Sequence, residues 1–210
     1  MKERGMIFNG EMVRALLSGQ KTQTRRIMKN QPAGDHPDTP VSVRCIDDGF
    51  QWHGWHGEST VFPCPFGKAG DRIWVRETFQ GPLFDYDKMD AYLKDSTPFE
   101  KPEFCQYAAD GGPRPEYQDM DDNIRYGWKP AIHMPRWASR LLLEITEVRV
   151  ERLRSMSQDD ARAEGVIAAS GPMEAGLAFR ELWDSIYGEE SWKANPWVWV
   201  IEFKRVEGNA

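Results

Sequence analysis

The sequence lacks the features that mark membrane and secreted proteins. Its 210 residues contain no run of 18 apolar residues, which is about the length that a membrane-spanning helix needs. The first residues, Met-Lys-Glu-Arg-Gly-Met-Ile-Phe, are too few and too acidic for a signal peptide. We therefore expect a cytoplasmic protein with no membrane partner.

Cysteine is scarce, and the three present (Cys45, Cys64 and Cys105) are an odd number, which argues against a disulfide framework. Cys45 and Cys64 flank His53 and His56 in the pattern C-x7-H-x2-H-x7-C, whose residue types suit zinc. These spacings match none of the common structural zinc patterns, so we expect no metal and no cofactor. Zinc stays an open alternative.

An excess of positive charge is also missing. With 27 Lys and Arg against 33 Asp and Glu, the net charge is -6, whereas binding of long duplexes through bulk electrostatics needs many cations facing phosphates. We therefore expect no long duplex DNA partner. Local basic patches remain, and nine tryptophans offer flat faces that fill a core or stack on an unpaired base.

The length and the 40% hydrophobic content allow one elaborated domain with a substantial core. Residues 30–69 carry five prolines and many glycines, so they read as a loop-rich insertion around a short strand. Residues 81–129 hold eleven acids against six Lys or Arg, with five prolines and little periodicity. We interpret this segment as an acidic, aromatic and irregular insertion into a single domain spanning residues 1–210.

Periodicity predicts several regular elements in the rest of the chain. Apolar residues at helical spacing, with caps and glycine stops, predict helices over 9–18, 157–164 and 173–187. Ser157 and Asp160 form a capping-box pattern at the start of the second of these. Alternation and β-branched residues predict strands over 41–46, 72–79, 141–153 and 196–204.

The most informative stretch is residues 9–29. Asn9 can cap a helix, and Gly19 can end it in the left-handed conformation. The next residues, Lys21-Thr-Gln-Thr-Arg-Arg26, include no apolar side chain, unlike a core strand. From these residues alone, the plain interpretation is a solvated basic strand, on which Lys21 is exposed and contributes little to stability.

This stretch resembles the signature of the ASCH family of the PUA-like superfamily, Gly-x-Lys-x-x-x-x-Arg, through Gly19, Lys21 and Arg26. It is most similar to the small bacterial ASCH enzymes that hydrolyse N4-acetylcytidine, whose Lys-Thr-x-Thr-x-Arg run is matched by Lys21, Thr24 and Arg26. Their late glutamate and terminal strand are matched by Glu164 and by Val-Ile-Glu-Phe-Lys at 200–204. The resemblance implies an α+β fold, a PUA-like mixed β-barrel flanked by short helices, with an irregular insertion.

The same resemblance implies a mechanism of amide hydrolysis. Lys21 would be the proton acceptor, Thr24 the nucleophile and Glu164 the proton donor to the leaving amine. A lysine can serve as a base only if its pKa falls well below about 10.4. In a regular strand Lys21 and Thr24 point to opposite faces, so the start of the strand must turn or bulge for both to meet one substrate. The expected substrate-binding residues are Arg25, Arg26, Arg136 and His133.

Two classes of function stay open at this point. One is an amidohydrolase acting on an N4-acylated cytidine or a related modified nucleoside. The other is a non-catalytic reader of RNA or modified bases, the broader expectation for PUA-like folds, with a ribonuclease as a third. The partner is accordingly a modified nucleoside or single-stranded RNA. Taken singly, Lys21, Thr24 and Glu164 have plainer roles, as an ion-paired strand residue, a cross-strand threonine and an exposed acid.

Overall fold

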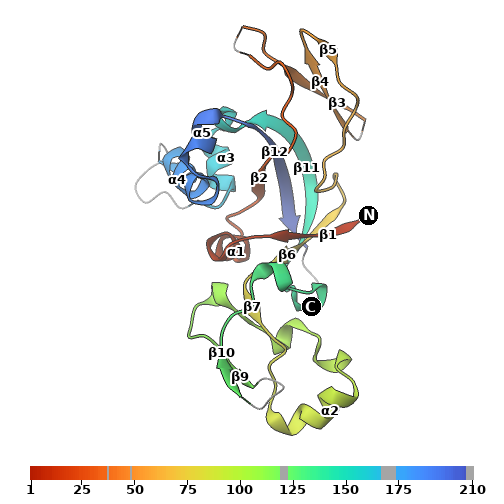
Figure 1. Cartoon of the computed structure of the whole chain (residues 1–210), viewed down its shortest axis with the longest axis vertical. Coiled ribbons are helices and arrows are strands. Elements are labelled where there is room, and N and C mark those ends of the chain that lie inside the picture. Colours follow the sequence, from red (N-terminus) through yellow and green to blue (C-terminus); the bar gives the residue numbers. More distant parts are fainter. Residues whose placement is uncertain (37, 48, 119–122, 167–173, 207–210) are drawn as a thin grey trace. The chain divides into compact units, whose positions relative to one another are not determined.

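The computed structural model describes residues 1–36, 38–47, 49–118, 123–166 and 174–206 (Figure 1). Residue contacts divide the chain into two compact units. The first unit comprises Met1–Lys2, Ser18–Arg72 and Glu144–Lys204, and the second comprises Glu3–Leu17, Ile73–Leu143 and Arg205–Ala210. Both units contain helices as well as strands, which confirms the mixed α+β class. The single-domain prediction stays a prediction.

The first unit is built on the long strand β11, the terminal strand β12 and the strand β2. In the sheet, β12 lies between β11 and β2, and it pairs with β2 in antiparallel fashion. A separate three-stranded sheet has the order β3-β4-β5. The elements of this unit are β2 (Gln23–Ile27), β3 (Ser42–Ile46), β4 (Gly49–Gly54), β5 (Gly57–Glu58), β11 (Leu142–Arg152, its first two residues in the other unit), α3 (Gln158–Ala163), α4 (Ala175–Tyr187), α5 (Glu189–Ala194) and β12 (Trp197–Arg205, its last residue in the other unit).

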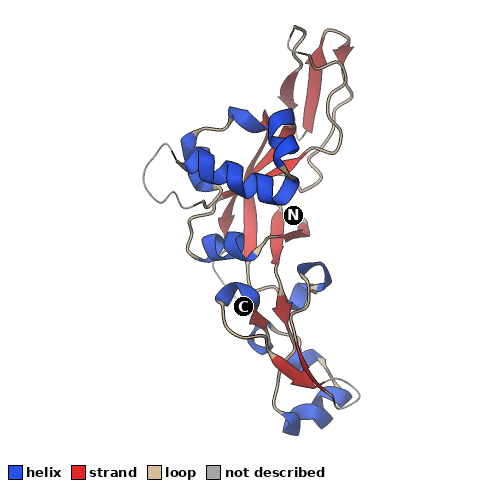
Figure 2. Cartoon of the chain, turned by 60° about the vertical axis from the view of Figure 1, so that its left-hand side comes forward, coloured by secondary structure: helices blue, strands red, loops and turns tan. Residues whose placement is uncertain are grey.

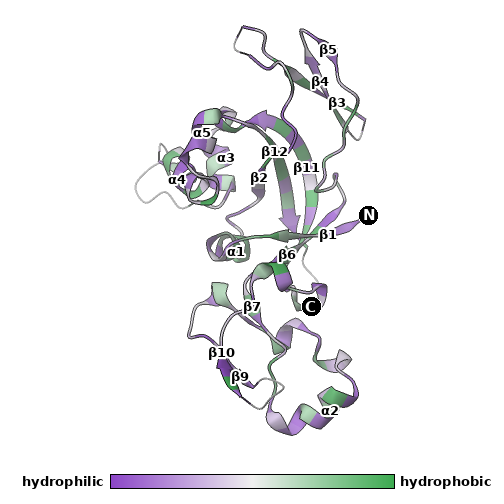
Figure 3. Ribbon diagram, viewed as in Figure 1, coloured by the Kyte–Doolittle hydropathy of each residue, from purple (hydrophilic) through white to green (hydrophobic). Residues whose placement is uncertain are grey.

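The terminal strand β12 is buried because its residues are branched or aromatic on both faces. Its first five residues are all buried, and its last two are exposed. Figure 3 shows hydrophobic residues within β12 and hydrophilic ones at its C-terminal end. A strand that is apolar on both faces needs other elements of the fold to pack against each face.

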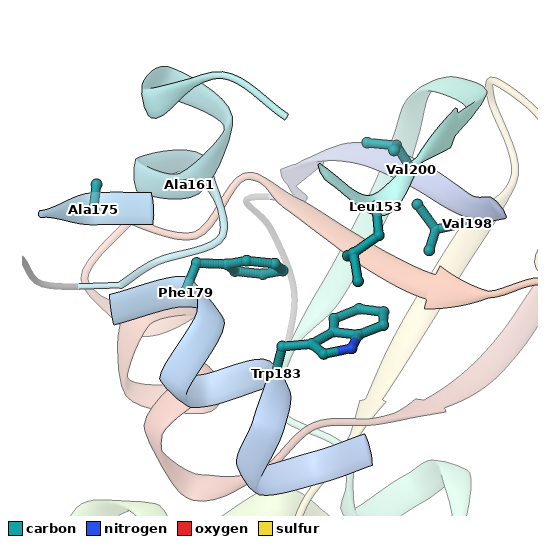
Figure 4. Close-up of a cluster of buried hydrophobic side chains, with 7 residues drawn as sticks. All are labelled: Leu153, Ala161, Ala175, Phe179, Trp183, Val198 and Val200. Atoms are coloured by element: carbon teal, nitrogen blue, oxygen red, sulfur yellow. The ribbon is translucent and has the colours of Figure 1, made fainter. Parts of the chain in front are cut away.

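One face of β12 is covered by helices. Phe179 and Trp183 of α4 lie against Leu153, Val198 and Val200, as Figure 4 shows. The other face presents Trp199, whose ring packs edge-on against Phe50 of β4 at 5.2 Å. Residues that stand directly opposite each other on paired strands point to the same face of the sheet. The register between β12 and β2 therefore also determines which of these two faces each β2 side chain occupies.

The helices that cover this sheet begin and end as their sequences predict. In α3 the Ser157 hydroxyl accepts from the Asp160 N–H, and the Asp160 carboxylate accepts from the Ser157 N–H, which confirms the expected capping box. Helix α4 ends at Gly188, which has a positive φ of 81°. Helix α4 contacts both α3 and α5 (Figures 1 and 2). Residue 173, the first of the predicted helix, lies outside the described residues.

The second unit contains the N-terminal helix and the acidic insertion. In α1 the Asn9 carboxamide oxygen accepts from the Met12 N–H at 2.8 Å, so the predicted cap is confirmed. Strand β1 neighbours β6 in the sheet. The elements of this unit are β1 (Glu3–Ile7), α1 (Gly10–Leu17), β6 (Arg72–Arg76, its first residue in the other unit), β7 (Phe79–Gln80), α2 (Met89–Lys94), β8 (Gln106–Tyr107), β9 (Glu116–Gln118) and β10 (Ile124–Tyr126).

The described residues of the insertion 81–129 form short strands, single 3-10 turns and one six-residue helix, α2. Its Tyr107 packs with Phe79, Met134 and Ala138, which all lie outside the insertion. The segment therefore shares its core with flanking residues rather than having a fully separate one.

The strand order of every sheet among the described residues has two free ends, so these sheets are open. The PUA-like barrel expected from the sequence stays a prediction. Within the described residues, every helix falls short of the length and apolar character that a bilayer crossing requires.

Candidate functional site

The segment that carries Lys21 is held between the end of helix α3 and the start of strand β2. Gly19 takes a positive φ of 76°, as its position after α1 predicts, and turns the chain into an extended course. Lys21 then forms an isolated antiparallel bridge with Glu164. The Thr22 N–H donates to the Ala163 carbonyl at 2.8 Å. These main-chain contacts fix the position of the Lys21 backbone, from which its side chain extends.

The Lys21 side chain is buried against Glu164. Its Nζ donates to both the main-chain carbonyl oxygen and the Oε2 atom of Glu164, each at 2.8 Å. The exposed fractions are 0% for the Lys21 side chain and 2% for that of Glu164. The expectation of an exposed Lys21 is therefore wrong, because the end of α3 covers the segment; the plain interpretation of Glu164 as an exposed acid fails for the same reason.

Arg25 also binds Glu164. Its NH1 group donates to Oε1 of Glu164 at 3.1 Å, while its NH2 group donates to Oε2 of Glu151 at 3.4 Å. The NH2 group also lies 3.5 Å from Oδ1 of Asp160. The Arg25 side chain has no exposed surface, and its carbon Cζ lies 6.0 Å from the centre of the Phe179 ring. Arg25, predicted to bind substrate, thus faces carboxylates in the free chain rather than solvent.

An outer layer of charges surrounds these residues. Arg149 donates to Glu151 at 2.5 Å and to Asp160 at 2.8 Å, and it is also paired with Glu202. Gln23, directly opposite Glu202 in the sheet, donates to the Asp160 carbonyl at 2.8 Å. We refer to the following seven residues as the charge cluster: Lys21, Arg25, Arg149, Glu151, Asp160, Glu164 and Glu202. It contains three cations and four carboxylates.

Burial changes the titration of Lys21. Loss of water around the amine is the largest effect, and it lowers the pKa of Lys21 from its ordinary value of 10.5. The Glu164 carboxylate acts in the opposite direction through charge and hydrogen bonding, while the positive charges of Arg26 and Arg25 lower the pKa further. The net direction is downward, toward an amine that can accept a proton.

The surroundings of Asp160 lower the pKa of its carboxyl group and so favour the ionised form. Burial raises its pKa, but hydrogen bonds from the Ser157 main chain and hydroxyl, a hydrogen bond from Gln23 and the charge of Arg25 lower it more strongly. The resulting pKa is about 2. Asp160 therefore remains a carboxylate over the whole physiological range, and it links the helix cap to the charge cluster.

Thr24 lies on the other face of strand β2. It is buried and stands directly opposite Ile201, whereas its neighbours Gln23 and Arg25 stand opposite Glu202 and Val200. Lys21, Gln23 and Arg25 all contact α3 or its C-terminal cap, so the alternation continues back to Lys21. The structure therefore brings Lys21 and Glu164 together, and it does not show the turn or bulge that would add Thr24.

The remaining candidates are spread over the chain. Arg26 is half-buried on the Thr24 face of β2, opposite Trp199. Arg136 and His133 belong to the second unit. Arg136 is exposed and donates from Nε to Glu3 at 3.1 Å, and His133 is exposed at the end of a 3-10 turn.

The zinc alternative gains no support from the geometry. Among the described residues, no group of three or more His, Cys, Asp or Glu side chains is arranged to hold a metal ion. His53 instead places its Nδ1 atom 3.0 Å from Oε1 of Glu58, and Cys45 is exposed while Cys64 is buried.

Sequence reasoning missed the outer part of the charge cluster. Asp160 was recognised only as a helix cap, yet its carboxylate also accepts from Arg149. The signal that could have found the others is alternation: Arg149 and Glu151 are two residues apart on β11, so they share a face and are able to pair. Glu202 lies within the terminal strand motif, which carries no sign of its pairing with Arg149.

In comparisons with known proteins, no family model matches this chain, and neither a curated protein nor a solved structure matches it significantly. What remains is the chemistry of the site itself. A buried amine and a buried carboxylate share a hydrogen bond within a charged cluster, an arrangement that is able to move a proton from one group to the other.

Proposed function

We propose that this chain is an ASCH-type amidohydrolase of PUA-like architecture that removes an acyl group from N4 of cytidine or a related modified nucleoside. The observation that supports this most is the 2.8 Å hydrogen bond between Lys21 Nζ and the Glu164 carboxylate, in a site where the pKa of Lys21 is lowered. Perturbed, buried and directly paired ionisable groups are typical of sites that transfer protons.

The proposed reaction uses this pair as a proton relay. A neutral Lys21 amine takes the proton of the attacking hydroxyl, whose oxygen forms a bond to the acyl carbon. The resulting ammonium passes a proton across the hydrogen bond to Glu164. Glu164 then gives that proton to N4 as the carbon–nitrogen bond breaks, so cytidine leaves as a neutral amine. Water completes the hydrolysis and releases the carboxylic acid, which leaves both side chains in their starting states.

The attacking hydroxyl must be reconciled with the position of Thr24 on the face of β2 away from Lys21. By resemblance Thr24 is the nucleophile and forms an acyl ester, which requires β2 to rearrange so that the Thr24 hydroxyl reaches Lys21. The Lys21 side chain has no exposed surface, so a substrate reaches it only when surrounding groups move. One local opening of residues 21–24 would meet both requirements. Thr24→Ala distinguishes the two nucleophiles: the variant loses turnover if Thr24 attacks the acyl carbon, and it keeps turnover if water does.

The direct test is to incubate the purified chain with N4-acetylcytidine and to measure both the change in absorbance and the acetate released. Parallel reactions contain the free nucleoside and a single-stranded oligonucleotide with one N4-acetylcytidine. Release of acetate from either substrate supports the proposal. Absence of acetate release from both substrates, with a folded protein, would reject it.

A reader without turnover is the second candidate, because two observations favour it. The Lys21 and Glu164 side chains are closed to solvent, and Thr24 lies on the opposite face of the sheet. A reader would bind an oligonucleotide containing the modified base and release no acetate. Its affinity would fall with salt in proportion to the phosphate contacts made.

A further inference from the structure

The first unit contains a cavity of about 190 Å³ at the end of the β3-β4-β5 sheet, apart from the residues of the charge cluster. One wall is the segment 32–34, and Val41 and Trp52 also line it. Trp55, His56 and Glu58, at and just after the turn between β4 and β5, complete the lining together with small residues. None of these residues takes part in the proposed hydrolysis.

The apolar part of the cavity is held rigidly. The Trp52 ring packs edge-on against Trp197 with ring centres 5.0 Å apart, and it packs in a tilted arrangement against Phe62 with ring centres 5.3 Å apart. The carboxylate of Asp35 ties the loop wall to the sheet: Oδ2 accepts from Trp197 Nε1 at 2.6 Å, and Oδ1 accepts from the Val41 N–H at 3.2 Å. The site is therefore formed before any ligand arrives, which reduces the entropy lost on binding.

The entrance combines an exposed indole with a carboxylate. Trp55 is 84% exposed, although tryptophan is normally largely buried. The Glu58 carboxylate lies 3.0 Å from Nδ1 of His53, which orients it. Among the described residues, the cavity lining includes the imidazole of His56 but no Lys or Arg, so it offers no permanent cation to a phosphate group. Two indoles and a carboxylate instead favour a positive charge.

We propose that this cavity binds a small organic cation with a methylated ammonium group. Aromatic faces attract such cations through their quadrupoles, and a carboxylate adds direct charge complementarity. The volume lies below the range of about 300–1,000 Å³ that is usual for drug-sized ligands, which fits a compact head group. This binding site is independent of the proposed hydrolase function.

The experiment compares choline with 3,3-dimethylbutan-1-ol, its uncharged isostere, by calorimetry and by tryptophan fluorescence. Choline binds at least about tenfold more tightly than the isostere, because only the cation gains from the ring faces and from Glu58. Trp55→Ala weakens choline binding at least about fivefold, Trp55→Phe weakens it less, and Glu58→Gln weakens it while preserving shape. Glu103→Gln, an exposed acid of the second unit, is the matched control and leaves binding unchanged.

Three results would overturn the proposal. Equal affinity for choline and the isostere would show that the cavity binds only through apolar contacts and does not recognise the positive charge. Choline binding that survives both Trp55→Ala and Glu58→Gln would place the cation elsewhere. Binding of a single-stranded oligonucleotide that depends on Trp55, without choline binding, would identify the indole as a base-stacking surface instead.

Discussion

Lys21 Nζ binds Glu164 twice, at the main-chain carbonyl and at the carboxylate, with both distances 2.8 Å. The carbonyl belongs to the C-terminal cap of α3, where helical carbonyls lack intrahelical partners and the helix dipole favours a cation. The same contact therefore closes the helix and forms the candidate proton relay. Experiments on either residue must measure stability and turnover separately.

Replacing Lys21 by Met is expected to destabilise the fold. The change leaves the buried Glu164 carboxylate with Arg25 as its remaining partner, and breaking a buried pair costs about 3–5 kcal/mol when no second cation is present. Because Arg25 remains, we expect about 2–3 kcal/mol, measured as the free energy of unfolding in urea. Lys204→Met, which removes an exposed partner of Glu144, should cost less than about 1 kcal/mol. Equal small losses in both variants would show that the buried contact contributes little.

Glu164→Gln should reduce turnover by roughly 10² or more while substrate still binds, because Gln has no proton to give the leaving amine. Glu151→Gln is the matched control, since Glu151 also contacts Arg25 but not Lys21. We expect that control to keep turnover within about tenfold of the unchanged chain. Similar losses in the two variants would mean that the charge cluster acts only by holding the fold.

Asp160 predicts a dependence of stability on pH. Its folded pKa of about 2 lies below the ordinary value of 3.8, so its contribution is fully present above about pH 4 and is lost as the pH falls toward 2. Asp160→Asn should therefore be less stable than the unchanged chain at pH 7, and the difference should shrink between pH 4 and pH 2. Urea midpoints across this range measure it. Asp159→Asn, a neighbouring acid with a 91% exposed side chain, should show a small difference at every pH, and a constant difference for Asp160→Asn would contradict the assignment.

The backbone of Gly19 offers a further test. A Cβ there would meet no atom within 4 Å, so Gly19→Ala tests only the positive φ of 76°. We expect a loss of about 1 kcal/mol in unfolding free energy. Gly127→Ala is the control, since that glycine also has open space but no positive φ, and it should show no loss. Equal results for the two variants would show that residue 19 is not constrained.

The regular elements around the site were predictable because their signals are local. The Asn9 cap, the Ser157 and Asp160 capping box and the run of branched and aromatic residues in β12 each depend on residues close in sequence. The burial of Lys21 was not predictable in this way. It depends on Glu164, which is 143 residues away, and a run of polar residues carries no sign of the helix end that covers it.

The site residues divide along the same line. The pairing of Lys21 with Glu164 was expected from the family resemblance, whereas the placement of Thr24 follows from the cross-strand register with Ile201, which no local pattern encodes. The outer charges were missed because Arg149 connects residues from three separate segments of the chain. Such contacts emerge only when the segments are folded together.

The most direct test of the central claim is the rate of acetate release from N4-acetylcytidine by the unchanged chain and by Lys21→Met. We predict turnover by the unchanged chain that rises with pH through a pKa below 10.5, because the neutral Lys21 amine is the base. Lys21→Met, studied at a temperature where it is folded, should show no turnover. Acetate release that persists in Lys21→Met, or none from the unchanged chain on either nucleoside or oligonucleotide, would contradict the account.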